Sequence, residues 1–247
     1  MAQTVHVPGA QLACSTHGEG SPVLLVHGIA ERAESWGPVV AQASASARVI
    51  AYDRRGYGDS SAPEPYERTT VAEQAEDAAA LLDAVAGGPA IVCGRDFGAL
   101  VALDLAKRHR RLVVGVAVID PPLFAFSAAA TEVLSAERLA LEDSLRDGGP
   151  AAAVRDWLQA RGAEPRRLEW ADADHTAFFA DFAGLATWPV SRRELRALDV
   201  PLAVLLSATA PSHVREAAEA LATLVPEARL ESDVTQALVA LDRDIRG

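Results

Sequence analysis

The apolar residues of this chain fall into short unbroken runs separated by amphipathic stretches, a pattern that predicts strands alternating with helices. Parallel strands read as continuous apolar runs because both of their faces are buried. Strands are predicted at 4–7, 11–16, 22–26, 48–52, 90–93, 113–119, 202–206 and 228–231. The alternation favours an α/β fold with a mostly parallel, doubly wound sheet, in which ligands bind at the carboxyl ends of the strands.

Helical patterns fill the gaps between these strands. Helices are predicted at 35–47, from a capping box of Thr70 and Glu73 to residue 86, after the strand at 90–93, and at 151–161, 212–224 and 234–245. From residue 123 to 189 the strand signal disappears and most of the aromatic residues appear. We interpret 123–189 as a helical lid inserted into a core formed by 1–122 and 190–247, with ordinary packing helices as the alternative.

The strand at 90–93 leads into the sequence Gly94-Arg95-Asp96-Phe97-Gly98, and a helical pattern follows directly. Two glycines in this spacing let a strand and a helix approach closely while the central residue is strained and exposed. This arrangement predicts a nucleophile elbow with Asp96 at its tip, where a serine is usual. The alternative is that Asp96 is the relic of a lost nucleophile.

Three motifs in this order resemble the α/β-hydrolase superfamily: His27-Gly28, the segment from Tyr52 to Ser60 (YDRRGYGDS), and the elbow itself. The resemblance implies an α/β-hydrolase fold with an inserted helical lid. An aspartate at the elbow is similar to the branch of epoxide hydrolases and dehalogenases, in which the carboxylate attacks carbon and a histidine-activated water hydrolyses the ester. By the same resemblance, the backbone amides of Ile29 and Phe97 form the oxyanion hole.

Several residues that this family uses for catalysis are missing from the expected positions of this chain. The family's acid follows the strand at 202–206, but the matching position here falls near Ala210, and residues 230–234 run into the last helix where the catalytic histidine belongs. The three tyrosines precede the lid, whereas related epoxide hydrolases use lid tyrosines. His175 in the lid and His213 at a helix start are candidates for a relocated base, each against a surface or capping role.

A second carboxylate is expected near the elbow. Asp120 follows the strand at 113–119, which is expected to lie beside the elbow strand. Two carboxylates near one apolar pocket do not both ionise freely, so one pKa is expected to rise and to suit acid–base catalysis. The alternative for Asp120 is a turn-forming residue before two prolines. The other residues expected in the substrate pocket are His27, Gly28, Trp36, Arg95, Phe124 and Trp157.

Net charge and composition indicate which binding partners and which cellular location to expect. A net charge of −11 argues against nucleic acid or an anionic membrane as a partner. Cys14 and Cys93 give neither a disulfide framework nor a metal-binding spacing. The first ten residues carry no secretory pattern, and no apolar run approaches the roughly 18 residues of a membrane span. We expect a cytoplasmic protein without cofactor or metal that takes a small-molecule substrate, with a homodimer left open.

Three functions remain open from the sequence. In the first, Asp96 is a general acid or base in a cofactor-free lyase, isomerase or cyclase whose substrate is small and largely apolar, in the manner of an aromatic or polyketide-like molecule. In the second, Asp96 is the nucleophile of an epoxide hydrolase or dehalogenase with a relocated histidine. In the third, the chain is a non-catalytic binding protein on a hydrolase fold.

Overall fold

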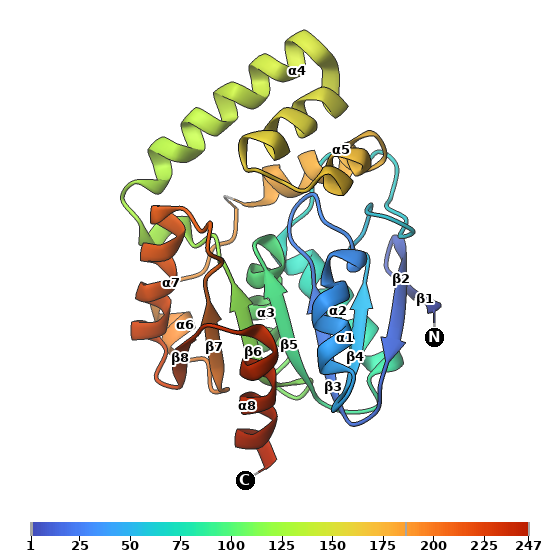
Figure 1. The fold of residues 1–247 in the computed structure, drawn as a ribbon, viewed down its shortest axis with the longest axis vertical. Coiled ribbons are helices and arrows are strands. Elements are labelled where there is room, and N and C mark those ends of the chain that lie inside the picture. The colour runs from blue at the N-terminus through green and yellow to red at the C-terminus, as the bar shows by residue number, and fades with distance from the viewer. Residues whose placement is uncertain (1, 186, 247) are drawn as a thin grey trace.

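The computed structural model describes residues 2–185 and 187–246, and within them eight strands form one sheet (Figure 1). The strands are β1 (Ala2–Val7), β2 (Ala10–His17), β3 (Ser21–Val26), β4 (Ala47–Tyr52), β5 (Ala90–Arg95), β6 (Val113–Ile119), β7 (Leu202–Leu205) and β8 (Ala228–Glu231). Their order is β1-β2-β4-β3-β5-β6-β7-β8, and every pairing from β4 to β8 is parallel. The predicted mostly parallel sheet is therefore confirmed.

Helices cover both faces of this sheet. The helical elements outside the hairpin described next are η1 (Ala33–Trp36), α1 (Gly37–Ala43), α2 (Val71–Val85), α3 (Phe97–Arg108), η2 (Phe124–Phe126), α6 (Arg192–Arg196), α7 (Ser212–Leu224) and α8 (Val234–Arg246). Helices α2, α3 and α7 share one apolar core with one face of the sheet. Helices α1 and α8 share a second core with the other face. This doubly wound arrangement is the predicted α/β-hydrolase fold.

Two long helices stand over the edge of the sheet where the parallel strands end (Figure 1). They are α4 (Ala130–Ala160) and α5 (Pro165–Leu185), called the α4–α5 hairpin below. Helix α4 bends at Gly149, whose φ of 79° is not helical, and Pro150 follows it. Both helices fall within the segment 123–189 that the sequence marks as helical. Of the helices among the described residues, none has the length and apolarity to cross a membrane.

Two local expectations need correction. The helix expected at 35–47 is instead the short η1 followed by α1, and β4 already begins at Ala47. The capping box at Thr70 is half formed, because Thr70 accepts the Glu73 amide at 3.0 Å while the Glu73 carboxylate turns away. That carboxylate accepts from the Arg55 guanidinium at 2.9 Å. The other oxygen of that carboxylate accepts from the Thr69 hydroxyl at 2.7 Å, so both oxygens have partners other than the Thr70 amide.

The two elbow glycines are required by packing. A Cβ on Gly98 would lie 2.3 Å from the Val26 carbonyl oxygen, and a Cβ on Gly94 would lie 2.0 Å from the Gly98 carbonyl oxygen. Helix α3 therefore crosses directly against the ends of β3 and β5. This close approach fixes the residue between the two glycines at the carboxyl edge of the sheet.

Candidate active site

Asp96 occupies the tip of the elbow between β5 and α3. Its backbone has φ 50° and ψ −121°, a conformation that L-residues adopt only when the surrounding structure imposes it. Its amide donates to the Ile119 carbonyl of the neighbouring strand at 2.9 Å. The side chain remains partly exposed. The elbow geometry therefore presents a carboxylate at the position where ligands bind in this class of sheet.

The amides expected to form an oxyanion hole hold the Asp96 carboxylate itself. The Ile29 amide donates to Asp96 Oδ2 at 3.1 Å. The Phe97 amide, at the start of α3, also lowers the pKa of Asp96. Ala30, which follows Ile29, has a φ of 52°. A residue with positive φ therefore lies on each side of this contact, Ala30 in one loop and Asp96 in the other. The Ile29 amide therefore orients the carboxylate in this structure.

The pKa of Asp96 is raised to about 6, mainly because burial disfavours the charged form. Among neighbouring charges, Glu31 raises it and Arg167 lowers it. Glu31 is only 5% exposed and accepts the Gly28 amide at 3.0 Å. Its other oxygen lies 3.5 Å from both Arg95 and Arg167. A carboxylate with a pKa near neutrality is suited to exchanging protons at physiological pH.

We expect Glu31→Gln to lower the pKa of Asp96 by roughly one unit, because the substitution removes a like charge while keeping an acceptor for the Gly28 amide. The pKa is measured from the carboxyl carbon signal of Asp96 in an NMR titration. Glu34→Gln, at an exposed carboxylate that pairs with Arg166, is the matched control and should leave Asp96 unchanged. An unchanged or higher pKa in Glu31→Gln would show that Glu31 is not the charge responsible.

Asp120 ends β6, beside the elbow strand, as expected from the sequence. Residues Arg95 and Ile119 pair directly in the sheet, so Asp96 and Asp120 follow neighbouring strand ends. Asp120 also has a positive φ, 49°, and its Oδ1 accepts the Ser207 amide at 2.9 Å. This bond ties the loop after β6 to the loop after β7. The carboxylate whose negative charge raises the pKa of Asp96 is Glu31, a residue that the sequence did not single out.

The two candidate histidines have other contacts. On α5, His175 Nδ1 lies 3.0 Å from the Asp172 carbonyl oxygen one turn earlier. His213 is buried near the start of α7 and stacks on Phe124 with ring centroids 6.3 Å apart. Among the described residues, the hydrogen bond given to the Asp96 carboxylate comes from the Ile29 amide. After β8 only two residues precede α8, and Asp233 caps that helix through the Gln236 amide at 2.8 Å.

The residues predicted to line the pocket divide into two groups. His27, Gly28 and Trp36 are buried, so they do not face an open pocket. Burial and the nearby Arg54 charge hold the pKa of His27 well below its usual range, which keeps the ring neutral. Its Nε2 accepts the Arg54 amide at 2.9 Å. Arg95, above the Trp36 ring at 4.6 Å, is partly exposed, as are Phe124 and Trp157.

A buried ion pair fixes the loop that carries Gly28 and Ile29 to the α4–α5 hairpin. The Arg54 guanidinium donates to the His27 and Gly28 carbonyls at 2.9 and 3.0 Å. The same guanidinium bonds both carboxylate oxygens of Asp181 on α5, at 2.5 and 3.1 Å. Burial disfavours the charged Arg54, but the Asp181 carboxylate outweighs it and raises the pKa of Arg54. Residues far apart in sequence thus set the position of the Ile29 amide.

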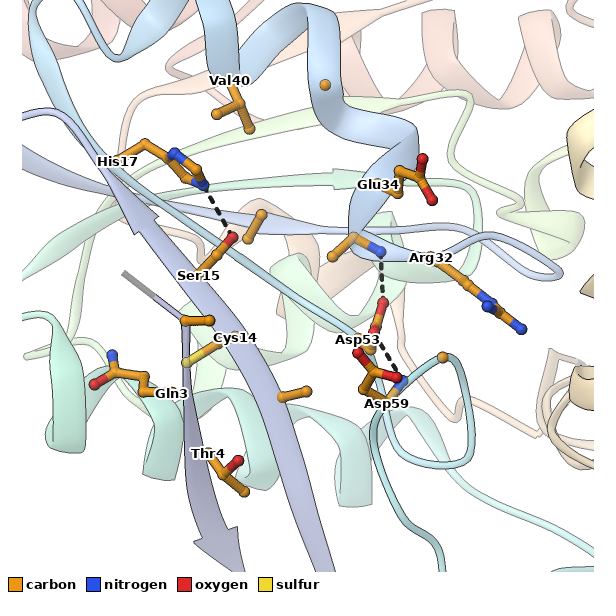
Figure 2. A pocket seen from close by; sticks show the side chains of 16 residues that line it. Gln3, Thr4, Cys14, Ser15, His17, Arg32, Glu34, Val40, Asp53 and Asp59 are labelled. Carbon is orange, nitrogen blue, oxygen red and sulfur yellow. Dashed lines mark hydrogen bonds between the residues drawn. The ribbon is translucent and has the colours of Figure 1, made fainter.

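Three hollows occur away from Asp96. The first, of about 690 Å³, lies between β2 and the η1–α1 segment (Figure 2). Within it Asp53 accepts the Ala33 amide at 2.7 Å and the Asp59 amide at 3.1 Å, so its carboxylate braces the loop of the YDRRGYGDS segment. The second, of about 450 Å³, is an apolar groove between α4 and α5. The third, of about 90 Å³, lies near Phe124 and Trp188. Asp96 lines none of these three.

Comparison with known proteins agrees with this geometry. The profile of the alpha/beta hydrolase family matches residues 23–246. Epoxide hydrolase A of Mycobacterium tuberculosis is 34% identical over 167 residues, 61% of this chain and 52% of that protein. A haloalkane dehalogenase of Sphingobium indicum is 31% identical over 119 residues, 47% of this chain and 40% of that protein. A thermophilic esterase from Thermogutta terrifontis has a TM-score of 0.79 at 24% identity, with 100% of both chains covered.

The chain belongs to the α/β-hydrolase family. It spans about half the length, or less, of these two curated relatives. The likeness to the esterase shows the fold alone, whereas the two curated relatives share a closer sequence likeness with part of this chain. Fold and family are thereby established.

Proposed function

We propose that this chain is an enzyme in which Asp96 acts as a general base, and then as the conjugate acid, on a small organic molecule. The reaction class is a cofactor-free lyase, isomerase or cyclase reaction. The observation that carries the proposal is a carboxylate at the tip of the elbow, held by the Ile29 amide, with a pKa raised to about 6. At pH 7 such a group is mostly ionised and becomes a usable acid once it has taken a proton.

The aromatic residues of the α4–α5 hairpin, which stands over the carboxyl edge of the sheet, favour a largely apolar substrate. Trp157 of α4 and Phe178, Phe179 and Phe182 of α5 form a contiguous aromatic cluster in the hairpin above the sheet. Aromatic walls with a few placed polar groups are typical of small-molecule sites. In such a site the Asp96 carboxylate removes a proton from carbon, and the C–H electron pair forms the new double bond of an enolate.

A second candidate is supported by the two curated relatives, which are an epoxide hydrolase and a haloalkane dehalogenase. In that case an Asp96 oxygen attacks a substrate carbon, and the C–O bond of an epoxide or the C–halogen bond breaks as an ester forms. Release of the ester needs a base that activates water. His175 bonds the Asp172 carbonyl through Nδ1 and His213 stacks on Phe124, and if neither serves as that base the ester accumulates.

Two measurements on the intact chain separate these candidates. We expect the chain to exchange the α-protons of 2-tetralone, an enolisable aromatic ketone, with D₂O faster than buffer does, as followed by NMR. We also expect no covalent adduct by intact mass after incubation with styrene oxide or 1-chlorohexane. A lasting adduct on Asp96 would establish the nucleophile instead. If the chain shows no proton exchange and forms no adduct, both proposals are contradicted and a binding protein is favoured.

A further inference from the structure

The peptide group between Gly28 and Ile29 is hydrogen-bonded at both ends. Its N–H, that of Ile29, donates to Asp96 Oδ2 at 3.1 Å. Its carbonyl oxygen, that of Gly28, accepts from Arg54 Nη2 at 3.0 Å and lies 2.8 Å from His27 Nδ1. Hydrogen bonds that share one polarisable group strengthen one another. Donors at this carbonyl therefore make the Ile29 N–H a better donor to Asp96.

Both nitrogens at the Gly28 carbonyl are donors. His27 Nε2 accepts the Arg54 backbone amide at 2.9 Å, and the low pKa of His27 keeps its ring neutral. The single ring proton is therefore assigned to Nδ1, which donates to the Gly28 carbonyl. The second donor is the guanidinium of Arg54, which carries a full positive charge. A bond from a charged donor is roughly twice as strong as a neutral one, so Arg54 has the larger effect on the peptide.

The Arg54 guanidinium is enclosed between the elbow and helix α5. Arg54 is 0% exposed, and its Cζ lies 4.9 Å from the ring centroids of both Phe97 and Tyr57. Phe97 directly follows Asp96 in the chain. On the opposite side, Asp181 of α5 accepts from both Nη atoms, at 2.5 and 3.1 Å. The positive end of this ion pair faces the Gly28 carbonyl, and its negative end belongs to the α4–α5 hairpin.

We propose that Arg54 is a positioning residue for Asp96, that it acts through the Gly28–Ile29 peptide, and that Asp181 holds it in place. This inference deepens the proposed function and rests on it, because Asp96 is the group that reacts. A stronger N–H donor stabilises the ionised carboxylate. The proton affinity of Asp96 thus depends on a carboxylate of the hairpin that has no contact with substrate.

The test is the pKa of Asp96 in the double variant Arg54→Met with Asp181→Leu, measured from its carboxyl carbon signal in an NMR titration. We expect this pKa to rise by roughly one unit, because the Ile29 N–H becomes a weaker donor. The Ile29 amide proton signal should move upfield. Proton exchange of 2-tetralone should fall about fivefold at pH 6 and change little at pH 8, where Asp96 is mostly ionised in both proteins. A merely structural role of Arg54 would instead lower exchange equally at both pH values.

The matched control is Arg55→Met with Asp77→Leu, which removes a second buried ion pair at the adjacent position. Arg55 bonds both oxygens of Asp77 at 2.6 Å. Its remaining bonds go to Glu73 and to the Pro8 carbonyl. Both double variants replace a buried ion pair by apolar side chains and leave neither charge of the pair buried alone. The control should leave the pKa of Asp96 and the Ile29 amide signal as in wild type.

Asp181→Asn provides a test with the opposite sign. The asparagine keeps the size of the side chain but removes its charge, so the Arg54 charge at the Gly28 carbonyl is no longer neutralised and the pKa of Asp96 should fall. An unchanged pKa in the Arg54–Asp181 double variant, an equal rise in the control, or a rise in Asp181→Asn would each overturn the inference. Failure of the proposed function would appear separately, as 2-tetralone exchange that is unaffected by Asp96→Asn, whatever the titrations show.

Discussion

Asp96→Asn is expected to lower turnover by about 10³-fold, because the amide neither accepts the substrate proton nor attacks carbon. The same substitution is expected to stabilise the fold at pH 8 by about 2–3 kcal/mol, from a pKa raised from 3.8 to about 6 at about 1.4 kcal/mol per unit. Asparagine retains an oxygen for the Ile29 amide and tolerates positive φ. Loss of activity together with gain of stability is typical of a functional site.

The pH dependence of that stability follows from the direction of the shift. Because the folded-state pKa of Asp96 is raised, the carboxyl group favours the folded state at low pH, and this contribution is lost as pH rises through about 6. The advantage of Asp96→Asn should therefore be largest at pH 8 and fall to about a third of that value at pH 4.5. Urea unfolding at both values measures it, with Asp83→Asn, at an exposed position on α2, as the control.

Equal stability of Asp96→Asn and wild type at pH 8 would show that the carboxylate is better solvated than its surroundings indicate. Retained turnover would remove Asp96 from the chemistry altogether. The two readouts are independent, since the first depends on desolvation of the carboxylate and the second on its reaction with substrate.

The strands and the elbow could be predicted from the sequence because their signals are local. An unbroken apolar run such as that in β6 has few alternatives to a buried strand. The spacing of Gly94 and Gly98 around Asp96 shows where a strand and a helix must nearly touch. These features depend on residues within a few positions of one another, so the chain order alone reveals them.

The surroundings of Asp96 could not be predicted in the same way. Glu31 reads as an ordinary polar residue after a strand, and only the fold buries it beside the elbow. The use of the Ile29 amide by the Asp96 carboxylate depends on a loop conformation that the sequence does not specify. Charged residues that only the tertiary structure brings together cannot be identified from their spacing in the sequence.

The buried carboxylate of Asp181 shows the same dependence, and its removal should have the largest effect on stability. Asp181 is fully buried and accepts bonds from Arg54, Tyr57 and Gln74. Asp181→Ala leaves the Arg54 guanidinium buried without a counter-ion, which costs about 3–5 kcal/mol. At about 2–4 °C per kcal/mol for a chain of this size, the melting temperature should fall by roughly 10 °C. Thermal unfolding followed by circular dichroism measures the change.

Two further variants separate the charge effect from simple loss of packing. Asp172→Asn lies on the same helix, α5, but its side chain is 73% exposed in its pair with Arg155, so it should change stability by less than about 1 kcal/mol. Arg54→Met combined with Asp181→Leu removes both charges and should recover much of the loss seen in Asp181→Ala, because an apolar pair of similar volume has no desolvation penalty. A double variant no more stable than Asp181→Ala would show that the bonds from Arg54 to the His27 and Gly28 carbonyls, rather than charge balance, maintain this part of the fold.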